Sequence, residues 1–317
     1  MLKETEPDLT CKICGESFKS ERSLHAHIKA HNIFVMDYYT TFYPRKNLLT
    51  GEPIEFKDKK QYFSTYFSNR AQIREWAKKT TNKEEVKELF IKMLKNRIVG
   101  KNLQYSPNHL ELKLYNLPSI SMFKEYFGSY NEACKMLQVE PIYNKIIKNK
   151  FLNNNKNLND MEILIDTREQ QPLSFTNSKL HKLDYGDYTA SGKYYNKTYI
   201  DRKSEQDFKG TMTTGFSRFT KEMERAISFD SYMYIVIESS IEKIIKNNPF
   251  AYHESNLKFI WHRMRKITHM FPRKCQFVFS GGRNRSQNLI PILLEAGEHL
   301  WQSDVQYYID SKKLLIQ

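Results

Sequence analysis

The sequence predicts an α/β domain at the C-terminal end of the chain, with a central mixed sheet flanked by helices. After residue 160, five short runs rich in β-branched and aromatic residues alternate with longer runs of helical periodicity. Such alternation is typical of a sheet covered by helices. A Cys/His motif and a mainly helical stretch precede this domain, so the chain combines at least two kinds of folded unit.

The chain has 317 residues, which suggests two or three domains. We expect four segments in order: a small ββα zinc finger at 1–33, an aromatic, basic and mainly helical accessory region at 34–143, an Asn/Lys-rich linker at 144–160, and the α/β domain at 161–317. The linker is expected because its sequence has few apolar residues and many Asn and Lys.

The N-terminal motif has the spacing C-x2-C-x12-H-x3-H. Two thiolates on a hairpin and two imidazoles one helical turn apart give a tetrahedral Zn²⁺ site, and the metal supplies folding energy that so small a unit lacks. The motif resembles the Cys2His2 zinc finger in full. The expected zinc ligands are Cys11, Cys14, His27 and His31.

The helix of this finger offers little for reading base sequence. Its expected base-facing positions are Ser20, Ser23 and Ala26, and none suits bidentate readout of a base. Arg22 and Lys19 are placed to reach phosphates. The finger therefore contacts the DNA backbone or, alternatively, binds protein.

The accessory region combines aromatic rings with basic side chains. Such a mixture suits single-stranded or distorted nucleic acid, although rings at helical spacing are also common in ordinary cores. Residues 81–97 predict an amphipathic helix with Asn82 as its N-cap. The rings are Tyr38, Tyr39, Phe42, Tyr43, Tyr62, Phe63, Tyr66, Phe67 and Trp76, and the cations are Arg45, Lys46, Lys57, Lys59, Lys60, Arg70 and Arg74.

Residues 117–140 predict two short helices divided by Gly128 and Ser129. The order of residues resembles the small helical repeats that accompany homing-type endonucleases. The alternative is an ordinary helical hairpin.

In the α/β domain, three strand-like runs each deliver an acid at or near a strand end: Asp166, Asp187 and Asp201. Lys203 follows two residues after the last acid, and residues two apart in a strand face the same side. Carboxylates that converge with a lysine suit metal-assisted hydrolysis of phosphodiesters, because hard oxygen ligands hold Mg²⁺ and a cation offsets charge on the phosphate.

The same residues resemble a family. Gly186-Asp187, then Asp201-Arg202-Lys203 and Asp207, match the pattern of the XPF-type nuclease domain within the PD-(D/E)xK restriction-endonuclease-like superfamily, and the stretch 166–169 matches its Asp-x-Arg-Glu strand. The resemblance continues through 215–225 to the strand 234–238. One position departs: the family has a glutamate where this chain has Asp201, and both acids bind metal.

The resemblance implies roles for these residues. Asp187 and Asp201, with the carbonyl of Arg202, are expected to bind Mg²⁺ or Mn²⁺, and Asp166 is expected to help hold a second ion if two metals operate. Lys203 is expected to orient the attacking water and stabilise charge, a role its amine suits if burial and metal lower its pKa.

The remaining candidates have two interpretations each. Arg202 and Arg168 clamp the phosphate or brace the acids, while Glu169 and Asp207 support these residues or form ion pairs. Beyond them, Arg218 and Arg225 bind the DNA backbone or belong to a solvated helix face.

The net charge of +14 indicates a polyanionic partner, most simply DNA. An anionic membrane surface is the rival, but no basic amphipathic helix supports it. No run of about 18 apolar residues predicts a membrane span, and the N-terminus does not look like a signal peptide. We therefore expect an intracellular protein, in cytoplasm, nucleus or, if viral, the host cytoplasm.

The resulting hypothesis is a metal-dependent DNA endonuclease acting on branched or flapped DNA in recombination, repair or replication. XPF-type enzymes commonly act as dimers, so the resemblance implies a homodimer or an unidentified partner subunit. Two alternatives stay open: a site-specific endonuclease of the homing or restriction kind, and an inactive DNA-binding scaffold.

Overall fold

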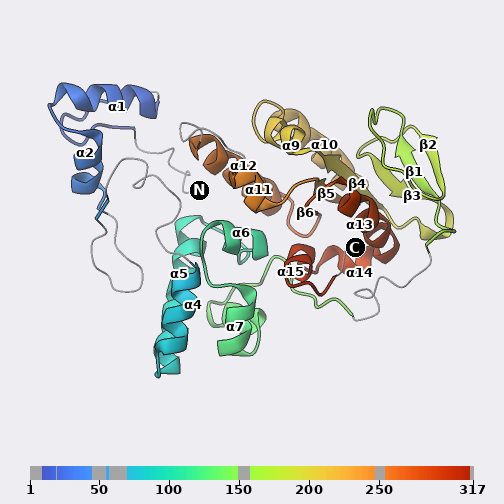
Figure 1. Cartoon of the computed structure of the whole chain (residues 1–317), viewed down its shortest axis with the longest axis horizontal. Coiled ribbons are helices and arrows are strands. Elements are labelled where there is room, and N and C mark those ends of the chain that lie inside the picture. The colour runs from blue at the N-terminus through green and yellow to red at the C-terminus, as the bar shows by residue number, and fades with distance from the viewer. Residues whose placement is uncertain are drawn as a thin grey trace.

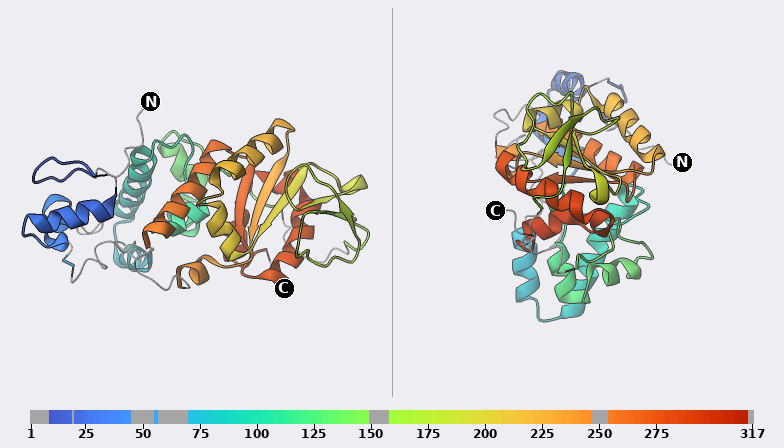
Figure 2. Two further views of the ribbon diagram at one scale, coloured as in Figure 1. Left: turned by 90° about the horizontal axis from the view of Figure 1, so that it is seen from above. Right: turned by 90° about the vertical axis from the view of Figure 1, so that its right-hand side faces the viewer.

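The computed structural model describes residues 9–18, 20–44, 55–56, 70–148, 158–246 and 254–314. The chain forms a small N-terminal unit, a helical region and an α/β unit (Figure 1). In both Figure 1 and the left view of Figure 2, the N-terminal unit and the sheet lie at opposite ends, with the helical region between them.

The α/β unit is built on a six-stranded mixed sheet with the order β2-β1-β3-β4-β5-β6. Strand β3 is antiparallel to β1 and β4, whereas β4, β5 and β6 run parallel to one another and β2 runs parallel to β1. This confirms the predicted fold class. The strands are β1 (Ile163–Asp166), β2 (Ser178–His181), β3 (Tyr188–Ala190), β4 (Thr198–Lys203), β5 (Tyr232–Ile237) and β6 (Cys275–Phe279).

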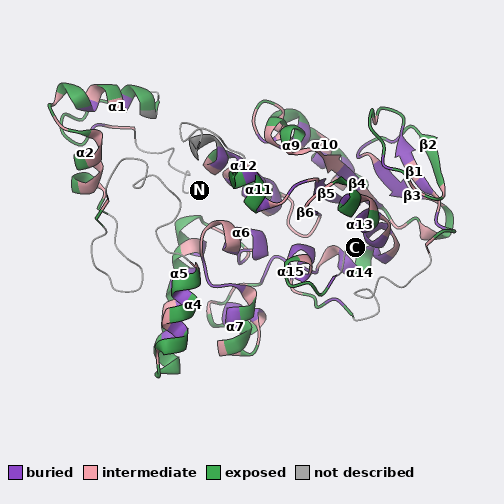
Figure 3. Cartoon of the chain, in the orientation of Figure 1, coloured by how far each residue is buried: buried purple, intermediate pink, exposed green. Residues whose placement is uncertain are grey.

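Helices cover both faces of this sheet, and strand β5 is buried along its whole length (Figure 3). One face packs against α13 (Arg283–Ala296), α14 (Glu298–Trp301) and α15 (Val305–Asp310). The other face packs against α9 (Glu205–Thr211), α10 (Phe216–Ser228), α11 (Ile241–Lys246) and α12 (Glu254–Met270). Apolar residues on alternate positions of β5 serve the two cores, which explains its continuous apolar sequence.

Strand β2 was not predicted from the sequence. All four of its residues are exposed and only Leu180 is apolar, so the run shows no apolar alternation. It forms because it lies at the sheet edge and pairs in register with β1, from Ile163↔Ser178 to Asp166↔His181. A strand of this kind is specified by its neighbour rather than by its own side chains.

The helical region contains α4 (Arg70–Lys79), α5 (Lys83–Gly100), α6 (His109–Leu114), α7 (Ile120–Phe127) and α8 (Tyr130–Met136). Asn82 caps α5 by accepting a hydrogen bond from the Glu84 N–H, as predicted. Gly128 ends α7 with φ +80°, and Ser129 caps α8. The two short helices predicted at 117–140 are therefore confirmed as structure.

Helix α6 joins the helical region to the α/β unit. Its first residue, His109, donates from its backbone N–H to the Asp304 carboxylate at 2.7 Å, and its ring lies 3.0 Å from Asp310 Oδ2. Glu111, 4% exposed, bridges Arg97 of α5 and His269 of α12. The two parts thus share a buried ionic joint.

The start of the predicted linker is packed rather than free. The Lys145 N–H donates to the Gln302 carbonyl at 2.9 Å, and the Ile147 N–H donates to Tyr308 Oη at 3.0 Å. Ile147 is buried in the core beneath α13–α15. One buried isoleucine among Asn and Lys is enough to anchor the segment, and composition alone does not reveal it; residues 149–157 lie outside the described residues.

Within the described residues, no helix has both the length and the apolar character needed to cross a membrane.

Candidate metal sites and acidic centre

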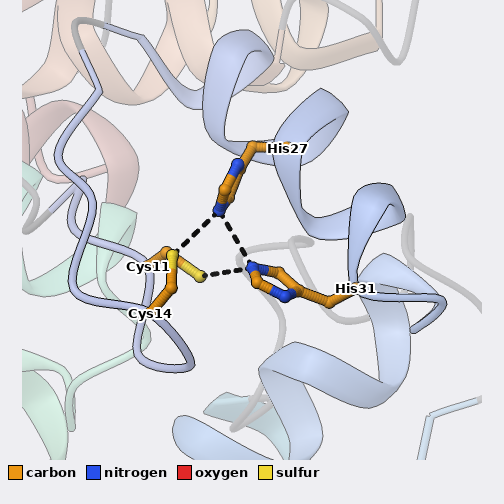
Figure 4. Close-up of side chains that lie close together, drawn as sticks. All are labelled: Cys11, Cys14, His27 and His31. Atoms are coloured by element: carbon orange, nitrogen blue, oxygen red, sulfur yellow. Dashed lines mark hydrogen bonds between the residues drawn. The ribbon is translucent and has the colours of Figure 1, made fainter.

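The N-terminal Cys/His motif forms a compact group (Figure 4). The ligand atoms of Cys11, Cys14, His27 and His31 all lie within 4.8 Å of one another, which makes a site able to hold a metal ion. The isolated Thr10–Ser17 bridge closes the turn that carries both cysteines, and α1 (Glu21–Ala30) carries His27. Two thiols and two imidazoles in this arrangement fit tetrahedral Zn²⁺.

A second helix, α2 (Val35–Phe42), completes this unit. Tyr38 of α2 is fully buried against Leu24 and Ile28, and its Oη accepts a hydrogen bond from the Lys12 N–H at 2.8 Å. The packed unit, which we call the Cys/His unit, therefore includes residues 9–43 and passes the boundary expected at residue 33.

The predicted DNA-facing residues of α1 are only partly available. Ser20 caps the helix and accepts from the Ser23 N–H, whereas Arg22 and Ala26 are exposed. Lys19 lies outside the described residues, as do Tyr62, Phe63, Tyr66, Phe67, Arg45, Lys46, Lys57, Lys59 and Lys60.

In the α/β unit, Asp201 and Lys203 of β4 face the same side, as alternation along a strand predicts. The Lys203 ammonium lies 2.9 Å from Asp201 Oδ1. Asp201 is 5% exposed, and its Oδ2 is buried with no hydrogen-bond partner among the described residues. A buried carboxylate oxygen left without a partner is costly, and a bound cation would satisfy it.

Asp187 lies beside this pair, just before β3. Its backbone is fixed between two strands, because its N–H donates to the Ile200 carbonyl and its carbonyl accepts from the Asp166 N–H. Its carboxylate Oδ2 accepts from the Arg202 N–H at 2.6 Å. Asp187 thereby turns its side chain toward Asp201.

The pKa values of both carboxyl groups are raised above their usual values. Burial raises the pKa of Asp187 well above its usual value, and the negative charge of Asp201 raises this pKa further. Burial also raises the pKa of Asp201, and the charge of Glu222 adds to this, although Lys203 opposes the rise. The pair therefore favours a proton or another cation between them.

The pKa of Lys203 is shifted in the opposite direction from the expected one. Burial alone would lower its pKa, but Asp201, Asp187 and Glu222 together raise the pKa above its usual value. The side chain is therefore a charged ammonium that stabilises negative charge.

Glu222 of α10 is a member of this group to which the sequence analysis gave no role. Its Oε1 accepts a hydrogen bond from the Gly186 N–H at 3.1 Å. The spacing of residues on β4 gives no information about a residue on a helix. The signal that could have found Glu222 is the apolar face of α10, where Phe219, Met223 and Ala226 are buried and Glu222 lies at the edge. We call Asp187, Asp201, Lys203 and Glu222 the acidic centre.

Arg202 points to the opposite face of the sheet. Its guanidinium binds Glu169 at 3.0 Å and Glu238 at 2.9 Å, and all three side chains are nearly buried. It also donates to the Gln171 carbonyl at 3.1 Å. The arrangement fits the bracing interpretation of Arg202 and Glu169, since both are engaged with each other.

Asp166 is engaged by Arg168. The Arg168 guanidinium binds both carboxylate oxygens at 2.8 and 3.0 Å, and the Leu183 N–H donates to Oδ2 at 2.8 Å. Although burial raises the pKa of Asp166, these donors lower it below its usual value overall. Asp166 thus has its own cation, and the Arg168 side chain is 62% exposed beside it.

The other candidates lie around the acidic centre. Asp207 accepts from Ser204 Oγ at 2.6 Å, and its N–H donates to the same oxygen, so it forms a capping box at the start of α9. Arg218 is exposed near the start of α10, and exposed Arg225 donates to the Asp184 carbonyl at 2.8 Å.

No protein-family model matches the chain, and no curated protein matches it in sequence. Similar solved structures include XPF from Aeropyrum pernix, with 13% identity and a TM-score of 0.33 over 43% of this chain and 66% of that chain. A second is the same protein in complex with DNA, with 12% identity and a TM-score of 0.32 over 43% of this chain and 62% of that chain. Both likenesses cover less than two thirds of the solved chains.

Proposed function

We propose that this protein is a divalent-metal-dependent DNA endonuclease whose active site is the acidic centre. The observation that carries the proposal is the pair Asp187 and Asp201, one half-buried and one buried carboxyl group, both with raised pKa values, beside a charged Lys203. Asp201 Oδ2 has no hydrogen-bond partner among the described residues. Carboxyl groups whose pKa values are perturbed by burial and by a specific charged partner cluster at functional sites.

The residues fit Mg²⁺ or Mn²⁺. Asp187 and Asp201 offer hard carboxylate oxygens, and the Arg202 carbonyl is the proposed third ligand. When bound, the metal would polarise a phosphate oxygen and lower the pKa of a water molecule. Asp166 is a weaker candidate for a second ion because Arg168 and the Leu183 N–H already engage its carboxylate.

Lys203 supplies the positive charge of the chain itself. Held by Asp201 at 2.9 Å, its ammonium is positioned to donate hydrogen bonds to a phosphate oxygen or to the attacking water. Its partial exposure, 13%, leaves it shielded from bulk solvent, where its charge has more effect. Arg168, exposed beside the centre, is a proposed backbone clamp.

We also propose that the front of the chain grips DNA. A zinc-bound Cys/His unit would present Arg22 to phosphates, and the helical region would act as a DNA-binding accessory module. The net charge of +14 supports a polyanionic partner. We also propose that a homodimer or another subunit helps hold the substrate. The segments 1–33, 34–143, 144–160 and 161–317 are kept as the proposed division of the chain, with the Cys/His unit extending into the second segment and the start of the third packed on the α/β unit.

The test is cleavage of end-labelled plain duplex, 3′-flap, fork and single-stranded DNA in Mg²⁺ or Mn²⁺. We expect wild type to cut branched substrates, and Asp187→Asn and Lys203→Ala to bind them but cut at least about 100-fold more slowly. Asp160→Asn is the matched control, because this exposed acid pairs with Lys193 outside the acidic centre and its loss should leave cleavage nearly unchanged.

Other outcomes would change the proposal. Cutting of plain duplex at one fixed sequence would indicate a site-specific endonuclease. Binding that persists without any cutting, and that weakens steeply with salt, would indicate a DNA-binding scaffold. Equal loss in the Asp160 control would contradict the assignment of the acidic centre.

A further inference from the structure

Four aromatic rings form a continuous row beside the acidic centre. Ring centroids are 6.5 Å apart for Tyr195 and Tyr199, 4.6 Å for Tyr199 and Tyr185, and 6.4 Å for Tyr185 and Phe229. The residues come from the segment before β4, from β4, from the loop before β3 and from the end of α10. We call them the aromatic row.

The two ends of the row face solvent while its middle is anchored. Tyr195 is 49% exposed and Phe229 is 62% exposed, whereas Tyr185 is 4% exposed. Tyr185 Oη lies 2.7 Å from Ser231 Oγ, and the hydroxyls of Tyr195 and Tyr199 lie 3.3 Å apart. The exposed rings therefore pack against inner rings that are held in place, which reduces the entropy cost of binding a flat ligand.

The row is placed in register with the acids. Tyr199 precedes Asp201 by two residues on β4 and faces the same side, so their Cα atoms are about 7 Å apart along the strand. Tyr185, in the loop before β3, packs against the Tyr199 ring and precedes Asp187 by two residues. Both inner rings thus lie next to the proposed reaction site.

Helix α10 also carries residues that run from the acidic centre toward the aromatic row. Positions 218, 222, 225 and 229 are spaced by four, three and four residues, so they share one side of the helix and its C-cap. Lys203 lies over the Phe219 ring at 5.3 Å, Glu222 bonds the Gly186 N–H, and Arg225 bonds the Asp184 carbonyl. Moving along the helix, one meets the acidic centre, then an exposed cation, then the exposed ring of Phe229.

The acidic centre, the Arg225 cation and the exposed rings lie in an order that matches the phosphates and bases of one nucleic-acid strand. A phosphate suits the acidic centre with its metal, the next phosphate suits Arg225, and bases stack on aromatic faces. In a paired duplex the base faces are already stacked inside the helix, so exposed rings can accept only unpaired bases. Plain duplex would leave Tyr195 and Phe229 unused.

We infer that the aromatic row is a stacking platform for unpaired bases of the DNA strand that enters the acidic centre. This inference rests on the proposed endonuclease function and specifies its substrate: a strand that is single-stranded immediately beside the phosphate to be cut. The exposed rings of Tyr195 and Phe229 make the contact, and Tyr185 and Tyr199 support them.

The test measures binding without divalent metal, so that it does not depend on cutting. Fluorescence anisotropy compares three DNAs: a duplex with a short single-stranded flank, the same DNA with abasic residues in the flank, and the plain duplex. We expect wild type to lose affinity roughly tenfold when the flank bases are removed. The double variant Tyr195→Ala, Phe229→Ala should bind the normal flank as weakly as the abasic one, with plain-duplex affinity unchanged.

Phe259→Ala is the matched control, since this ring on α12 is 42% exposed but outside the row. It should keep the full dependence on bases, and thermal melting should confirm that all variants fold. Wild-type binding that ignores the bases, or a control that loses the dependence equally, overturns the inference. Cleavage with no base dependence would reject the platform and keep the endonuclease, whereas base dependence with no cleavage would keep the platform and reject the endonuclease.

Discussion

At the scale of single residues, the chemistry of the acidic centre is set by desolvation. The folded-state pKa values of Asp187 and Asp201 are raised, so the folded protein holds protons more tightly than the unfolded chain. In the metal-free protein, the protonated carboxyl groups contribute to folding stability at low pH. This contribution is lost as the pH rises from about 4, the usual pKa of Asp, through the raised folded-state pKa values. Above that window both ionised groups oppose folding unless a cation replaces the proton.

This gives a first prediction. Asp187→Asn should raise the thermal midpoint of the metal-free protein at neutral pH, because it removes one of two repelling charges. Mg²⁺ should raise the midpoint of wild type more strongly at mildly alkaline than at mildly acidic pH, and should have little effect on the variant. Differential scanning calorimetry provides the measurement; an identical Mg²⁺ shift in both proteins would contradict the metal assignment.

Gly186 supports a second prediction at this scale. Its φ of +68° lies in the left-handed region, and an added Cβ would approach the Ile200 carbonyl oxygen to 3.0 Å. Gly186→Ala should therefore destabilise the protein by about 1–3 kcal/mol and displace Asp187, which follows directly. Urea denaturation measures the first effect and cleavage the second. Gly192→Ala is the control for backbone strain alone, because its φ is +56° with open space at the Cβ position.

At the scale of secondary-structure elements, the sequence predicted those elements that have a periodic apolar pattern or a capping residue. The helix caps Asn82 and Ser129 and the apolar strand β5 could be predicted because the responsible side chains act within a few residues. The opposite case is β2, an exposed edge strand that exists only through its pairing with β1. Local sequence patterns do not predict pairing between elements that are distant in the sequence.

The candidate site shows the same division. The position of Lys203 beside Asp201 follows from strand alternation, whereas Glu222 enters the centre from α10 through tertiary packing. Likewise, pairing the Arg168 guanidinium with Asp166 requires knowing how the turn after β1 folds back. These partners decide which acids are free, so the sequence suggested the centre but not the engagement of each acid.

The Cys/His unit supports a prediction at this scale. Removing Zn²⁺ with a chelator should unfold residues 9–43, because a core of only Cys11, Leu24, Ile28 and Tyr38 is too small to fold without metal. Amide hydrogen exchange should show loss of protection in α1 and α2 while β4, β5 and β6 stay protected. Protection of α1 that survives chelation would show that α2 alone stabilises the unit.

At the scale of the whole molecule, the joint around α6 sets how the parts are held. Glu111→Gln should remove the charge that pairs with Arg97 and His269, at a cost of about 3 kcal/mol, because buried Arg97 is left without its counter-ion. Chemical denaturation of the full chain measures it. Glu75→Gln, which breaks an exposed pair with Lys79 on α4, should change stability little.

The same joint has a consequence for where DNA would be cut. Glu111 and His109 of α6 pair with His269 of α12 and Asp310 of α15, so these contacts tie the helical region to the α/β unit that carries the acidic centre. If the helical region binds DNA as proposed, this joint would set the number of nucleotides between the bound segment and the phosphate at the acidic centre. Incision sites on substrates of different sequence should therefore keep one spacing, and breaking the joint should blur that spacing before it abolishes cutting.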